Sequence, residues 1–169
     1  YYDATRVNLG LFQHDINVLW DLAPHDLSIM DYLIKASPEA IVATGQKHLN
    51  SHEDVAYMTL YFPEKVIAHV HVNWLSPVKV RTTLIGGEKR MLVWNDLDAD
   101  EKVKVYDKGV DIANREGVYE LLVNYRSGDM WAPQLEQVEA LRQELSYFVD
   151  CISSGQDPFN DGCAGLRVV

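Results

Sequence analysis

The sequence predicts an α+β fold: a large, predominantly antiparallel β-sheet with helices packed on one face and the other face open for oligomerisation. Three observations predict it. Six or seven short β-branched or aromatic segments follow one another between residues 41 and 125. The separators between them are short and rich in turn residues, which favours hairpins. Helical periodicity lies outside this series, so the helices are expected to gather on one face of the sheet.

The first expected strand covers residues 4–12. Apolar Val7 and Leu9 alternate with polar Arg6 and Asn8, so the two pairs point to opposite faces. A strand at the start of the chain can enter the sheet beside segments that come much later.

A helix is expected next. Asp21 is the predicted N-cap, and Pro24 is tolerable in a first turn. Ile29 and Leu33 lie on one helical face with Leu22, and the Ser-Pro pair at 37–38 ends the helix.

The strand series and the last helix complete the fold. The expected strands cover 41–49, 55–62, 66–75, 78–85, 90–95 and 103–106, with a last one at 118–125 after a looser stretch. The turns at 62–65, 76–77 and 86–89 predict hairpins between neighbouring strands. Residues 135–152 are amphipathic and predict a helix that Ser153-Ser154-Gly155 stops.

Composition limits the class of protein. The 169 residues predict a single domain with a real core, and the ends of the sequence suggest a fragment of a longer polypeptide. A net charge of −10 argues against a nucleic-acid partner, since phosphates are met by clustered Lys and Arg. No apolar run reaches the roughly 20 residues of a membrane-spanning helix. Cys151 and Cys163 lack zinc spacing and predict a pair of buried free thiols, so we expect a cytoplasmic protein without a metal.

The candidate catalytic residues are Asp21 and His25. They are four residues apart at a helix start, so both side chains point to the same side. A carboxylate there can hold the imidazole in one tautomer and suits it for general acid/base work on a sugar hydroxyl. Spacing alone also allows a structural interpretation, in which Asp21 caps the helix and His25 is a partly buried, satisfied histidine.

The segment Asp21-Leu22-Ala23-Pro24-His25, after a strand and before an apolar helix, resembles the D-x-G-x-H motif that opens the C-terminal domain of the Gfo/Idh/MocA oxidoreductases. Ala23 replaces the usual glycine, and Ser28 stands where many members have a second aspartate. The strand series, the Gly86-Gly87 turn and the closing helix extend the resemblance over nearly the whole chain.

The resemblance implies a longer enzyme. Members carry their own N-terminal Rossmann domain, with a Gly-rich phosphate loop and a Glu-Lys-Pro motif, which binds NAD or NADP. Gly86-Gly87 sits in an expected hairpin and is no phosphate cradle. Asp21 and His25 would then lie near the nicotinamide, with His25 assisting proton removal from a small-molecule sugar. This fragment alone would be inactive.

Further residues are candidates for substrate binding. Arg6 and Asn8 share a strand face and suit a carboxylate, phosphate or hydroxyl, although an interface role is open. Gln13 leads into the motif, and Tyr125 and Arg126 form a polar stretch that could reach a substrate. The amino-acid sequence of residues 8–13 and 19–26 is most similar to the sequences of members that act on nucleotide-linked amino sugars, such as UDP-N-acetylglucosamine-type 3-dehydrogenases.

His69 and His71 alternate on an expected strand and therefore face the same way. His-x-His is a metal spacing, but no third ligand can be placed beside it, which favours solvated or subunit-facing histidines. We therefore expect the open sheet face to form a homo-oligomer, a dimer or tetramer. Trp74, Trp94 and Trp131 are expected to pack at the sheet or an interface rather than to stack on a sugar.

Two other interpretations stay open at this point. The domain could be a non-catalytic sugar-binding or oligomerisation module of the same fold. A cystatin- or dehydratase-like α+β pocket protein fits the element order but not the segment from Asp21 to His25.

Overall fold

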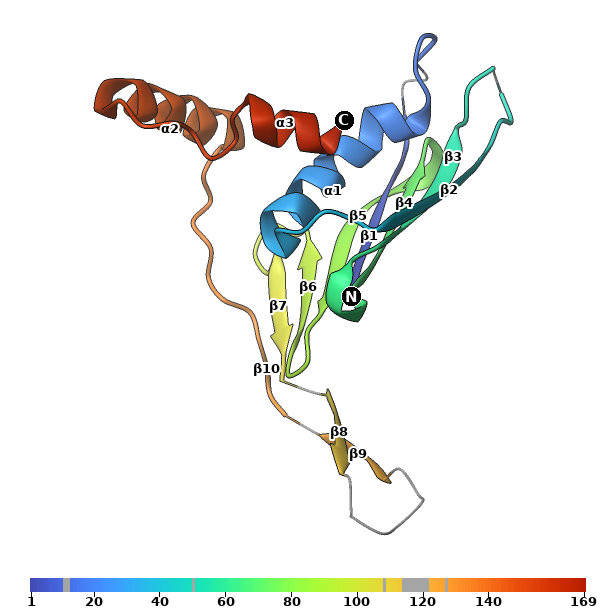
Figure 1. Ribbon diagram of the computed structural model, residues 1–169, viewed down its shortest axis with the longest axis vertical. Helices are drawn as coiled ribbons and strands as arrows, with labels where there is room; N and C mark the ends of the chain where they lie inside the picture. Colours follow the sequence, from blue (N-terminus) through green and yellow to red (C-terminus); the bar gives the residue numbers. More distant parts are fainter. Residues whose placement is uncertain (11–12, 50, 108, 114–121, 127) are drawn as a thin grey trace.

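A computed structural model describes residues 1–10, 13–49, 51–107, 109–113, 122–126 and 128–169, with only the backbone described for 109–113 and 122–126. The helices are α1 Val18–Ile34, α2 Ala140–Ser154 and α3 Gly162–Val168, with a 3-10 turn η1 at Pro63–Lys65. The strands are β1 Tyr2–Leu9, β2 Ala40–Gln46, β3 Val55–Tyr61, β4 Ile67–Asn73, β5 Leu75–Gly86, β6 Met91–Asn95, β7 Val103–Tyr106, β8 Gly109–Ala113, β9 Leu122–Arg126 and β10 Met130–Trp131. Figure 1 shows their arrangement.

The predicted α+β class is confirmed. Eight strands form one sheet in the order β10-β7-β6-β5-β1-β4-β3-β2, and β8 and β9 form a separate hairpin. Every pair in the large sheet is antiparallel except β1 with β4. The chain therefore builds most of the sheet from successive hairpins, as the short separators predict.

One predicted hairpin is wrong. The expected strands at 66–75 and 78–85 do not pair with each other, because β1 lies between β4 and β5 and bonds to both. Ser76 and Pro77 belong to β5 instead of forming a turn. The side chains of Tyr2 and Ala4 in β1 are buried. The position of β1 between β4 and β5 gives them a neighbouring strand on each side.

The helix α1 begins earlier than expected. Its N-cap is Asn17, whose side-chain oxygen accepts the Trp20 amide at 3.1 Å, so the prediction of Asp21 as N-cap is wrong. The Val18 amide donates to the Glu53 carbonyl at 2.9 Å, which fixes the helix start to the β2–β3 loop. Pro24 therefore lies inside the helix, where its missing N–H removes one backbone hydrogen bond.

The core lies between α1 and the central strands. Val18, Ala23 and Met30 of α1 pack on the alternating side chains of β1, β3 and β4. The largest buried members of this core are Trp74, Met30, Val18, Val70 and Val72. Because Val70 and Val72 face α1, His69 and His71, which alternate with them along β4, lie on the opposite, open face of the sheet.

The C-terminal third departs most from the predicted boundaries. Helix α2 starts at Ala140 rather than 135, because Glu139 caps it by accepting the amides of Leu141 and Arg142. It ends at Gly155, with φ 66°, as the Ser-Ser-Gly signal predicts. Strands β8 and β10 are not among the strands that the sequence predicts. No helix in the described part of the chain is long and apolar enough to cross a membrane.

Candidate functional site

The first candidate site lies at the N-terminal end of α1. The indole Nε1 of Trp74 donates to Asp21 Oδ2 at 2.8 Å, and Trp74 itself is only 1% exposed. The amide of Gly10 donates to the Trp74 carbonyl at 3.1 Å. Asp21 is thus held by a buried side chain at the end of β4, which places its carboxylate where β1, β4 and α1 meet.

His25 lies one helical turn beyond Asp21 and is exposed. Among the described residues no hydrogen bond joins the two side chains, since the recorded partner of Asp21 is Trp74. Both side chains still share one side of the helix, as four-residue spacing requires. The geometry therefore offers an anchored carboxylate beside an imidazole that a ligand can reach.

Arg6 lies beneath α1 and forms an ion pair with Asp26. Its Nε and Nη2 donate to the two carboxylate oxygens of Asp26 at 2.7 and 3.1 Å, and Asp26 is 3% exposed. The hydroxyl of Tyr2 donates to the Asp26 carbonyl at 3.2 Å. Burial, and then the charge of Asp26, raises the pKa of Tyr2 well above its usual range, so Tyr2 stays a neutral donor. Arg6 thus ties the helix to the sheet.

The other predicted binding residues are spread over the molecule. Asn8 is half-buried near the end of β1, and Gln13 is exposed in the loop before α1, so both belong to the same end of the sheet as Asp21. The side chains of Tyr125 and Arg126 lie outside the described residues. Their backbone belongs to the β8–β9 hairpin, which projects from the far end of the sheet (Figure 1).

A second histidine near α1 was missed from the sequence. His48 Nδ1 lies 2.6 Å from Oδ1 of the fully buried Asp54, whose other oxygen accepts the amides of His48 and Leu49 at 2.8 and 3.0 Å. Burial pushes the pKa of Asp54 upward, but these hydrogen bonds outweigh it and hold that pKa below its usual range. An Asp just before a strand and after a turn is the signal that predicts such a cap.

The open face carries the His-x-His pair. His69 Nδ1 is 3.7 Å from Asp3 Oδ1, and the ring of Tyr57 stacks on His71 with centroids 4.4 Å apart. The Nε2 atom of His71 is buried and has no hydrogen-bond partner among the residues that the structure describes. In the described part of the chain, no group of three His, Cys, Asp or Glu side chains is placed to hold a metal ion.

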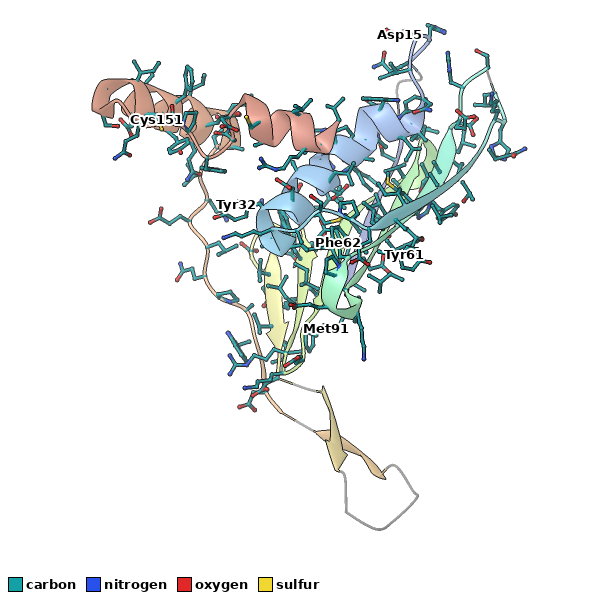
Figure 2. All side chains as sticks on the ribbon, in the orientation of Figure 1. Asp15, Tyr32, Tyr61, Phe62, Met91 and Cys151 are labelled. Carbon is teal, nitrogen blue, oxygen red and sulfur yellow. The ribbon has the colours of Figure 1, made fainter. Side chains whose placement is uncertain are left out.

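A large hollow lies beside the second half of α1, further along the helix than the first site. Its volume is about 1250 Å³, and it is bounded by the second half of α1, the strands β5–β7 and the segment around α3. Figure 2 shows how side chains fill the space under α1 but are sparser toward β6 and β7. Sequence reasoning missed this hollow because it depends on where α1 crosses the sheet.

Part of the chain matches a known domain family. Residues 12–93 match the family model described as GFO/IDH/MocA C-terminal domain, and Asp21 and His25 lie inside this range. No curated protein matches the chain.

Solved structures share the fold over the whole chain. UDP-N-acetylglucosamine 3-dehydrogenase GnnA from Acidithiobacillus ferrooxidans matches with a TM-score of 0.79 and 23% identity, over 99% of this chain and 49% of that one. Aldose-aldose oxidoreductase from Caulobacter crescentus, complexed with glycerol, has a TM-score of 0.72 and 16% identity over 99% and 49%. Levoglucosan dehydrogenase in complex with NADH has a TM-score of 0.70 and 14% identity over 99% and 52%. The chain spans about half the length of each.

Proposed function

We propose that this chain is the C-terminal, substrate-side half of a Gfo/Idh/MocA-type dehydrogenase that oxidises a sugar hydroxyl, with a nucleotide-linked sugar as substrate. The observation that carries the proposal is the anchored Asp21 beside the exposed His25, inside the segment that matches the family model. The likeness to GnnA supports the nucleotide-sugar class, since that enzyme is named for a UDP-linked sugar.

The roles of the two residues follow from their positions. Asp21 is held by the Trp74 indole, so its carboxylate stays on the same side of α1 as His25. The exposed imidazole of His25 takes the proton from a sugar hydroxyl as general base. Arg6 and Asp26 act beneath them by holding α1 at a fixed height above the sheet.

A nicotinamide dinucleotide, NAD or NADP, would supply the hydride acceptor. The described residues offer no cradle for it: the amide of Gly87 bonds the Arg90 carbonyl at 2.9 Å, so the glycine pair forms a hairpin turn and does not open a helix. We therefore assign the dinucleotide to an N-terminal Rossmann half, and we expect this chain alone to be inactive.

The exposed apolar side chains of helix α2 support the proposal that the protein has a second half. Its apolar side chains are half to two-thirds exposed: Leu141 66%, Leu145 64%, Phe148 51%, Val149 57% and Ile152 67%. Figure 1 shows α2 extending sideways from the sheet. An isolated helix of 15 residues is marginally stable in water, so a packing partner on this face is required.

The open sheet face supports a homo-oligomer, a dimer or tetramer. Tyr57, Tyr61 and Ile67 expose 42–45% of their surface on this side, and a partner subunit would cover them. Both cysteines are free thiols, which fits a reducing cytoplasm, but only Cys151 is buried as predicted, since Cys163 is exposed. Sedimentation of the full-length protein as a monomer at high concentration would contradict the oligomer.

The test of the proposed function uses the full-length protein. NADH formation is followed with UDP-linked hexosamines and their uronic acids, with free glucose and inositol as controls. We expect turnover with a UDP-sugar, and we expect His25→Ala to lower kcat at least about 100-fold, as loss of a general base does, with unchanged folding. Wild-type turnover in His25→Ala would remove His25 from the mechanism. Silence across the panel would favour a non-catalytic sugar-binding or oligomerisation module.

A further inference from the structure

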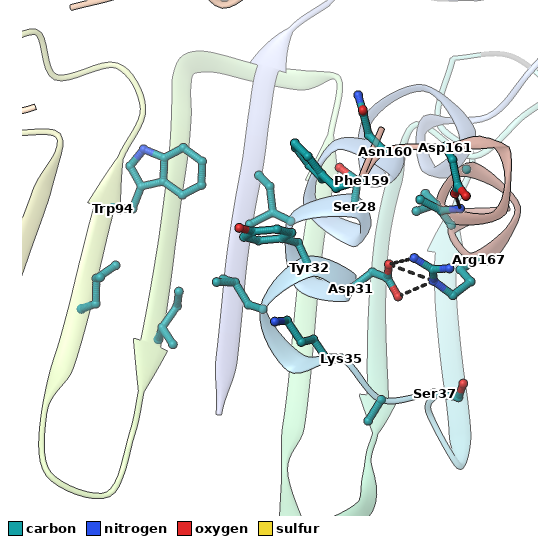
Figure 3. A pocket seen from close by; sticks show the side chains of 18 of the residues that line it. Ser28, Asp31, Tyr32, Lys35, Ser37, Trp94, Phe159, Asn160, Asp161 and Arg167 are labelled. Carbon is teal, nitrogen blue, oxygen red and sulfur yellow. Dashed lines mark hydrogen bonds and ion pairs between the residues drawn. The ribbon is translucent and has the colours of Figure 1, made fainter. Parts of the chain in front are cut away.

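The hollow beside α1 is walled by aromatic rings. Figure 3 shows Trp94 on the strand side and Tyr32 and Phe159 on the helix side. The rings of Tyr32 and Phe159 are 5.6 Å apart between centroids and tilted by 54°. The floor between them is apolar, with Ile85 and Leu92. Such walls favour a flat ring over a hydrated, non-planar one.

The hollow is lined by one ion pair and by the cation Lys35, whose Nζ lies 5.9 Å from the centroid of the Tyr32 ring. Arg167 Nε lies 3.1 Å from both oxygens of Asp31, and Arg167 Nη2 lies 3.0 Å from Asp31 Oδ2. Asp161 is used as the N-cap of α3, where it accepts the Ala164 amide at 2.8 Å. Asn160 adds an amide group, which can both donate and accept hydrogen bonds. The lining therefore suits a flat ring with polar edges, and Lys35 adds a positive charge beside it.

The hollow lies further along α1 than the candidate catalytic residues, which are not among the residues that line it. Asp21, His25, Ser28 and Tyr32 recur at intervals of three or four along α1, so they form one stripe on its surface. Ser28 and Tyr32 line the hollow. At 1.5 Å per residue, Tyr32 lies about 10 Å along the helix from His25. A substrate that reacts at His25 and continues along the stripe therefore reaches the aromatic walls.

We propose that the hollow binds the nucleoside of a nucleotide-linked sugar, with the base between Trp94 and Tyr32, while the sugar lies at Asp21 and His25. The inference rests on the proposed function and adds the place where the non-reacting part of the substrate is recognised. The competing occupant is another part of the protein covering the hollow, and the experiment below separates the two.

The first test measures binding without catalysis. The indole N–H resonances of the chain are followed by NMR in titrations with UMP and, as a matched control without a base, ribose 5-phosphate. We expect UMP to shift the Trp94 signal and to leave that of Trp131 unchanged, and we expect Tyr32→Ala to weaken UMP binding about 5- to 100-fold, as loss of one base–aromatic stack does. Tyr32 is 60% exposed, so this variant should fold. Equal shifts with ribose 5-phosphate, or none with UMP, would overturn the proposal.

The second test separates this inference from the proposed function. In the full-length enzyme, Tyr32→Ala and Trp94→Phe should raise KM for the UDP-sugar, leave kcat nearly unchanged and leave KM for the dinucleotide unchanged. Trp131→Ala is the control aromatic, because Trp131 lies on β10 under Arg90 and does not line the hollow. Unchanged KM in an active enzyme would reject the nucleoside site while the dehydrogenase stands.

Discussion

Helices α1 and α2 have similar lengths, 17 and 15 residues, and both are amphipathic, yet their surroundings differ completely. Helix α1 buries Val18, Ala23 and Met30 against the sheet and adds a buried ion pair through Asp26. Helix α2 leaves most of its apolar stripe exposed. The comparison teaches that an apolar stripe shows which side of a helix needs a partner, whereas the partner itself depends on the rest of the protein.

The largest expected effect concerns the ion pair under α1. Asp26→Ala leaves the Arg6 guanidinium buried without its partner, so we expect the free energy of unfolding to fall by about 3–5 kcal/mol. Urea unfolding of this chain measures it. The more exposed pair of Asp31 with Arg167 is the matched control, and Asp31→Ala should cost clearly less. Similar losses in both variants would show that burial does not distinguish the two pairs.

The next effect compares the two helices directly. Met30→Ala removes a side chain that is 2% exposed and should cost about 2–5 kcal/mol. Leu145→Ala on α2 should change stability by no more than about 0.5 kcal/mol in this chain, because Leu145 is 64% exposed. In the full-length protein the proposed partner should cover Leu145, so the same change should then cost clearly more. A large loss from Leu145→Ala in the chain alone would mean that α2 already has its partner here.

The smallest effect is a pH dependence on the open face. Burial, with the nearby charge of His69, lowers the pKa of His71 below 6.5, although Asp3 opposes this. The unfolded chain therefore takes up a proton more readily than the folded one. Stability is complete above about pH 6.5 and declines as the pH falls below it.

Urea midpoints measured between pH 8 and pH 5 test this. The decline should be shallower in His71→Asn than in the wild-type chain. His14→Asn, in the exposed loop before α1, should retain the wild-type slope. Identical slopes in all three proteins would assign the pH dependence to other groups.

Local sequence signals predicted much of the fold. Short β-branched segments with tight separators place most strands and their antiparallel pairing, and Gly155 ends α2 where the sequence indicates. The start of α1 was misplaced because Asn17 and Asp21 are both good caps, and the choice depends on the contact of Val18 with Glu53 from the β2–β3 loop. Within the candidate site, Asp21 and His25 follow from spacing, whereas the hydrogen bond from Trp74, 53 residues away, does not.

The sequence by itself determined the α+β class, the hairpin order of most strands and the side-by-side placement of Asp21 and His25, because these depend on periodicities of two and 3.6 residues and on turn chemistry. The tertiary structure alone decided that β1 enters between β4 and β5, that Arg6 is paired with Asp26, and that α1 leaves a hollow over β5–β7. These features join residues far apart in the chain. Such contacts depend on which surfaces pack together, and local patterns carry little information about that choice.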